Sequence, residues 1–76
     1  MSDRTRHEFR DGRGLVVLTT TVHRSGRCEV YTFAAWDTTE PADKERAAAW
    51  LRQWFPQHTH DQTYAMLTIG RPEAHP

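Results

Sequence analysis

The chain has 76 residues, which is enough for one small domain with a thin core. Ten basic and ten acidic residues give a formal net charge of zero, so no overall field draws the protein to nucleic acid or to an anionic membrane. The longest apolar run, Leu15 to Leu18, is far shorter than a membrane span of about 20 residues, and residues 1–13 lack the apolar core of a signal peptide. Cys28 is the single cysteine, so no disulfide can form within the chain. We therefore expect a soluble cytoplasmic protein.

The N-terminal residues 1–13 are polar and charged, and Phe9 is their only side chain able to anchor them to a core. They are interpreted either as a flexible arm or as a short edge strand over residues 6–10. A third arrangement, in which the arm folds over a sheet face through Phe9, also stays open.

Residues 15–23 and 27–36 are rich in β-branched, aliphatic and aromatic side chains, a composition typical of strands. Ser25-Gly26 lies between them and is a turn signal, so the two segments are predicted to form a hairpin.

Two registers compete for this hairpin. A two-residue turn pairs Val22 with Glu29 and places charges beside apolar groups on both faces. A type I turn followed by Gly26 in the left-handed conformation pairs Val22 with Cys28 and sorts the residues cleanly. We therefore expect the second register.

In that register one face of the hairpin carries no charge. Its residues are Val16, Leu18, Thr20, Val22, Cys28, Val30, Thr32, Ala34 and Trp36. The opposite face carries Leu15, Val17, Thr19, Thr21, His23, Arg27, Glu29, Tyr31, Phe33 and Ala35. The uncharged face is the one expected to pack against the rest of the domain.

A helix is predicted from about residue 39 to residue 55. Thr38 or Thr39 suits its N-cap, Pro41 suits its first turn, and Pro56 ends it. Its apolar stripe at helical spacing consists of Ala47, Ala48, Trp50, Leu51, Trp54 and Phe55. We expect this stripe to lie on the uncharged sheet face.

Residues 63–69 are predicted to form a third strand after the polar loop 56–62. Ala65, Leu67 and Ile69 would point to one face, and Tyr64 and Met66 to the other. The tail 71–76 is expected to be mobile.

These elements predict an α+β fold of β-β-α-β order, with a mainly antiparallel three-stranded sheet and one helix on one face. The single domain would span residues 14–70. In size and element order it is similar to small phage and plasmid proteins that block host machinery, anti-CRISPR proteins among them. No sequence motif supports a closer relationship.

The main candidate site is the sheet face that the helix leaves bare. We expect it to carry Tyr31, Phe33, Tyr64, Met66, Val17, Arg27 and Glu29, with Leu15 beside them. Several exposed aromatic side chains together typically mark an interface. The sequence therefore predicts a non-enzymatic protein-binding module, either a homodimer or an inhibitor or adaptor of a larger partner.

Single-stranded nucleic-acid binding is the alternative, because sheet aromatics can stack on unpaired bases and arginines can hold phosphates. Arg24 and Arg27 lie near Tyr31 and Phe33 in the hairpin. A basic arm would add Arg4, Arg6, Arg10 and Arg13, although Asp3, Glu8, Asp11 and Glu29 are interleaved with these arginines.

Catalytic and metal sites are not expected. His58 and His60 could share a metal ion in an extended stretch, but no spacing in the chain supplies the three or four ligands that zinc needs. Cys28 and His23 would form a thiol and base pair only in the register that we do not favour. No cofactor, metal or enzymatic activity is predicted.

Overall fold

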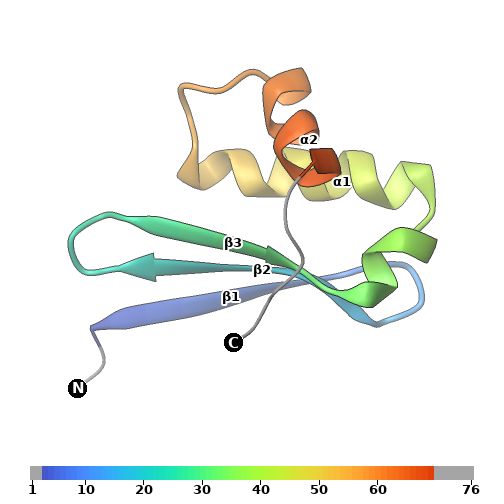
Figure 1. The fold of residues 1–76 in the computed structure, drawn as a ribbon, viewed down its shortest axis with the longest axis horizontal. Coiled ribbons are helices and arrows are strands. Elements are labelled where there is room, and N and C mark those ends of the chain that lie inside the picture. Colours follow the sequence, from blue (N-terminus) through green and yellow to red (C-terminus); the bar gives the residue numbers. More distant parts are fainter. Residues whose placement is uncertain (1–2, 70–76) are drawn as a thin grey trace.

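A computed structural model describes residues 3–69 of the protein. Its strands are β1 (Arg4–Arg10), β2 (Val16–His23) and β3 (Cys28–Thr32), and its helices are α1 (Pro41–Leu51) and α2 (His60–Ile69). The short 3-10 helices η1 (Ala34–Thr38) and η2 (Arg52–Trp54) flank α1. The strands form one antiparallel sheet in the order β1-β2-β3, and both α-helices lie on the same side of it (Figure 1). The α+β class, the three-stranded antiparallel sheet and a helix packed on one face are thus confirmed.

The β2–β3 hairpin has the bulged register that the sequence favours. Val22 pairs with Cys28, and the His23 N–H donates to the Arg27 carbonyl at 2.8 Å. Gly26 has a φ of +96°, a left-handed conformation that glycine adopts without steric cost. The division of hairpin residues between two faces is therefore confirmed for the paired segment.

The second hairpin strand is shorter than predicted. β3 ends at Thr32, although the Phe33 N–H still donates to the Val17 carbonyl at 3.1 Å. The chain then turns into η1, so Ala34 and Trp36 are not strand residues. Trp36 nevertheless reaches the core from η1, where only 6% of it is exposed.

The N-terminal residues form the outer strand β1, which pairs with β2 from Arg4↔His23 to Arg10↔Val16, with a bulge between Phe9 and Arg10. Phe9 lies on the helical side, with its ring centroid 5.5 Å from that of Trp50. Residues 4–10 therefore extend the sheet sideways and do not fold over its other face.

The prediction of a strand over residues 63–69 is wrong, because these residues belong to α2. Thr63 and Leu67 are buried, which is the i, i+4 spacing of a helix, and Ala65 is exposed. A short apolar run fits both a strand and a buried helix by periodicity alone, and here packing against α1 decided between them.

The predicted helix is confirmed as α1 with η2 following it, and its apolar stripe faces the core. Pro41 occupies the first turn as expected, but the N-cap residue is Glu40 and no side chain caps the helix. Neither Thr38 nor Thr39 is therefore the cap. The Thr39 hydroxyl instead donates to the Ala35 carbonyl at 2.8 Å.

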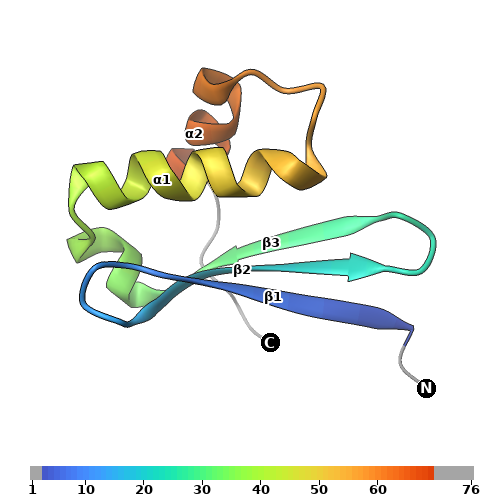
Figure 2. The same cartoon turned by 180° about the vertical axis from the view of Figure 1, so that it is seen from behind.

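The core lies between the helices and one face of the sheet. It consists of Phe9, Val17, Leu18, Trp36, Ala47, Ala48, Leu51 and Leu67. Seen from behind, α1 runs along the sheet, and α2 packs against α1 on the same side of the sheet (Figure 2). Because both helices occupy this side, no helix formed by residues 3–69 lies over the other side of the sheet.

Candidate functional site

The candidate site is the sheet face turned away from the helices, which we call the open face (Figures 1 and 2). Successive strand side chains alternate between faces, so the register places every second residue there. The open face carries Arg4, Arg6 and Glu8 from β1, Thr19, Thr21 and His23 from β2, and Glu29, Tyr31 and Phe33 from β3 and its end.

A hollow follows the middle of the open face. One part has a volume of about 230 Å³ and is lined by Arg6, Thr19, Thr21, Tyr31 and Phe33. A second part of about 270 Å³ is lined by Arg4, Arg6, Thr21, Glu29 and Tyr31. The two parts share three lining residues, so we treat them as one central groove.

The side chains of the sheet explain the shape of the central groove. Thr19 and Thr21 on β2 are short and almost fully buried, so they form a low floor. Arg6 on β1 and Tyr31 on β3 are long, so they rise as walls on either side. The groove is therefore cationic along one wall and aromatic along the other.

Glu29 is the centre of a polar cluster beside the groove. The Tyr31 hydroxyl donates to Glu29 Oε1 at 2.6 Å, and Arg27 lies 2.6 Å from Glu29 Oε2. His23 Nε2 is 3.0 Å from the same Oε2, at ion-pair distance without an aligned hydrogen bond. The hydrogen bond from Tyr31, together with His23 and Arg27, lowers the pKa of Glu29 below its usual value despite partial burial. The carboxylate is therefore ionised and already well partnered.

Arg6 and Arg10 on β1 form exposed ion pairs with Glu8, and Arg10 also donates to the Gly14 carbonyl at 2.8 Å. Arg6 lies 2.9 Å from Glu8, and Arg10 lies 3.7 Å from the same carboxylate. The two arginine side chains are 55% and 60% exposed, and exposed ion pairs of this kind hold side chains weakly.

The open face and its rim are positive overall. They bring together Arg4, Arg6, Arg10, Arg24 and Arg27 with Asp3, Glu8 and Glu29, which leaves an excess of two positive charges. The protein as a whole is neutral, so this excess is a local property of the face.

The structure brings some of the predicted contact residues together. Tyr31, Phe33 and Glu29 share the open face, and Arg27 lies beside them at the hairpin end. Val17 does not join them, because it lies at the bulge between β1 and β2 and is fully buried in the core cluster. Leu15 is 46% exposed in the loop before β2.

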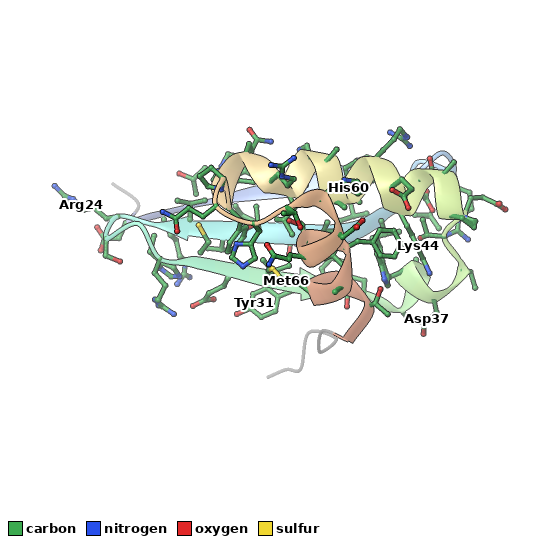
Figure 3. All side chains as sticks on the ribbon, turned by 90° about the horizontal axis from the view of Figure 1, so that it is seen from above. Arg24, Tyr31, Asp37, Lys44, His60 and Met66 are labelled. Atoms are coloured by element: carbon green, nitrogen blue, oxygen red, sulfur yellow. The ribbon has the colours of Figure 1, made fainter. Side chains whose placement is uncertain are left out.

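Tyr64 and Met66 do not join the open face. Both lie on α2, in the helical layer, whereas Tyr31 is at the outer strand of the sheet (Figure 3). Tyr64 packs against the core cluster. Their predicted placement beside Tyr31 depended on a strand over 63–69 and is corrected with it.

The sequence does not reveal the groove itself. The hairpin register predicts the face of Thr19 and Thr21 but no contribution from them to a site, and it predicts Arg6 in an arm or edge strand without placing it beside Tyr31. A usable signal was present, because Arg4, Arg6 and Glu8 alternate with Thr5 and His7 at the two-residue period of a strand.

A second polar cluster, also missed, fixes the β1–β2 loop. The Asp11 side chain is only 1% exposed and accepts hydrogen bonds from the Arg13 and Leu15 N–H groups. Burial raises the pKa of Asp11, but the hydrogen bonds and charge of Arg13 outweigh this and lower it. Arg13 also donates to the Thr38 hydroxyl at 2.9 Å and the Ala35 carbonyl at 3.0 Å. This cluster joins the loop to η1 and is internally satisfied, so we interpret it as structural.

No group of three metal-ligating side chains gathers within residues 3–69. His58 packs edge-on against Phe55 with centroids 5.7 Å apart, and His60 contacts Glu45. Cys28 and His23 fall on opposite faces of the hairpin, so they do not form a thiol and base pair. Over the same residues, neither α-helix has the length and apolarity needed to span a bilayer.

Comparisons with known proteins add no relative. No protein family, curated protein or solved structure matches the chain. The function is therefore inferred from the geometry of this molecule.

Proposed function

We propose that the protein is a small non-enzymatic binding module that holds a protein partner on its open face. The main support for this proposal is that both helices lie on one side of the sheet, while the other side presents a groove between Arg6 and Tyr31. A sheet face lined by aromatic and arginine side chains has the composition enriched in protein interfaces.

The arrangement of the groove supports recognition more than catalysis. Tyr31 and Phe33 are half-buried, so their rings offer contact area at low entropic cost, and Arg6 supplies charged donors next to them. Glu29 is occupied by Tyr31, Arg27 and His23 and has no second carboxylate beside it for general acid–base chemistry. The partner is either a second copy of the chain or a larger protein that the module inhibits or adapts.

The double variant Tyr31→Ala with Phe33→Ala tests this proposal. We expect it to abolish self-association in sedimentation velocity, or capture of the native partner from the host, because both rings leave the groove. Circular dichroism should show a retained fold, since neither side chain belongs to the buried core.

A matched change on the helical layer, Trp54→Ala, provides the control. Trp54 is also a half-buried aromatic residue, but it packs on the opposite side of the sheet near His7. Association should survive this change. Equal loss of association in both variants, or unfolding of the Tyr31 and Phe33 variant, would refute the proposal.

Single-stranded nucleic acid is the second candidate, and the opposed Arg6 and Tyr31 walls of the groove favour it. Bases would stack on the rings while arginines hold phosphates. Binding should then weaken steeply as salt rises. Absence of binding to single-stranded DNA and RNA at low salt would dismiss this candidate.

A further inference from the structure

We infer that the partner enters the central groove as an extended acidic peptide segment, with carboxylates at Arg6 and apolar side chains against Tyr31 and Phe33. This inference rests on the proposed function and specifies the partner's chemistry. It follows from the shape of the groove, its charge and the position of its own carboxylates.

The shape suits one extended chain. β1 and β3 each lie about 4.8 Å from β2, so the two walls stand roughly 10 Å apart across the floor. Thr19 and Thr21 line that floor along β2, and the two hollows share Arg6, Thr21 and Tyr31 in their linings. The resulting groove runs with the strand, which matches a peptide in a β conformation better than a compact ligand.

The charge favours an acidic partner. A guanidinium carries five donors, and the single contact of Arg6 to Glu8 leaves most of them available to a second carboxylate. On the other wall, Glu29 is satisfied by Tyr31, Arg27 and His23, so it does not require a cation from the partner. The local excess of two positive charges therefore attracts carboxylates to the β1 side of the groove.

The same carboxylates argue for a peptide over a nucleic acid. Glu8 and Glu29 stand at the two sides of the sheet, and the lowered pKa keeps Glu29 ionised at neutral pH. A nucleic acid carries one negative charge per nucleotide and would bring phosphates close to both. A peptide can place single carboxylates at Arg6 and uncharged residues elsewhere.

Three labelled probes test the inference on the full chain by fluorescence anisotropy. They are an acetylated peptide of alternating glutamate and leucine, the same peptide with lysine in place of glutamate, and an oligothymidylate of equal length. We expect saturable binding of the glutamate peptide below about 1 mM, the weak end of specific affinities, and none of the other two. Amide shifts in a nitrogen–proton NMR spectrum should map to Arg6, Thr21 and Tyr31.

Two variants and one control then separate charge from shape. Arg6→Gln should weaken the glutamate peptide about tenfold, the loss expected for one charge-assisted contact. Arg52→Gln removes an exposed arginine from the helical layer and should leave binding unchanged. Thr21→Leu fills the groove floor without altering any charge, and it should abolish binding of the glutamate peptide.

The outcomes distinguish this inference from the proposed function. No binding of the glutamate peptide, equal binding of the lysine peptide, tighter binding of the oligothymidylate, or shifts outside the groove would each overturn the acidic-segment inference. If Tyr31→Ala with Phe33→Ala abolishes native association but neither Arg6→Gln nor Thr21→Leu weakens it, the binding module stands and the acidic segment is refuted.

Discussion

The two rows of β2 side chains are almost equally buried but lie in very different surroundings. Leu18 faces the helices and Thr19 faces away, yet their exposed fractions are 0% and 1%. Leu18 is enclosed by well-packed apolar groups such as Phe9 and Leu51, whereas Thr19 lies under the longer walls of the groove. In a central strand, burial alone therefore does not identify the core, and the neighbours decide whether a position stabilises the fold or forms a site.

The largest expected effect is on the helical side. Leu18→Ala should lower the free energy of unfolding by about 2–5 kcal/mol, because it leaves a cavity among groups that cannot collapse into it. Urea denaturation followed by circular dichroism measures the change. Thr19→Ala, one residue along on the open face, should cost clearly less, and equal losses would break the distinction between the two rows.

The hairpin turn keeps each residue on its face. Gly26→Ala should cost about 1–2 kcal/mol, because an alanine at a φ of +96° brings its Cβ against the backbone. Ser25→Ala at the neighbouring position should stay within about 0.5 kcal/mol. Thermal or urea unfolding of the pair gives the comparison, and an unaffected Gly26 variant would contradict the bulged register.

Glu29 on the open face should contribute to the loss of stability at acid pH, as should Asp11 and Asp43, whose pKa values are also lowered. The folded pKa of Glu29 lies below its ordinary value of 4.5, so its stabilising contribution is present above that pH and is lost as the pH falls through the folded pKa. Glu29→Gln should therefore lose less stability on acidification than the parent, measured by urea midpoints between about pH 6 and pH 2.

Tyr31→Phe sharpens the pH test, because it removes the hydrogen bond that lowers this pKa most and leaves the carboxylate in place. It should reduce the acid dependence in the same direction as Glu29→Gln. Parallel pH curves for the parent and both variants would show that Glu29 is not held as described.

The smallest expected effect on stability is at Arg6. Its side chain is 55% exposed and its ion pair with Glu8 is at the surface, so Arg6→Gln should change the free energy of unfolding by less than about 0.5 kcal/mol. The same variant should weaken partner binding, as described above. A large loss of stability would mean that the groove wall is part of the folded framework.

The site was only partly predictable for a specific reason. The alternation of the hairpin placed Tyr31, Phe33 and Glu29 on one face, because the register fixes which side chains share a face. The hairpin pattern gives no information on Arg6, because Arg6 lies on β1, which a loop held through Asp11 and Arg13 separates from β2. Tyr64 and Met66 do not lie on this face, because their segment has the period of a helix and not that of a strand.

By itself, the sequence determined the features that depend on neighbours along the chain. The β-branched runs, the left-handed Gly26 and the stripe of α1 are local, so they predicted the hairpin, its register and the helix correctly. The tertiary structure decided the rest. Residues 4–10 and 60–69 are short and weakly patterned, so pairing with β2 made the first a strand and packing against α1 made the second a helix. Among the residues that the structure describes, this arrangement leaves the opposite sheet face without a helix over it.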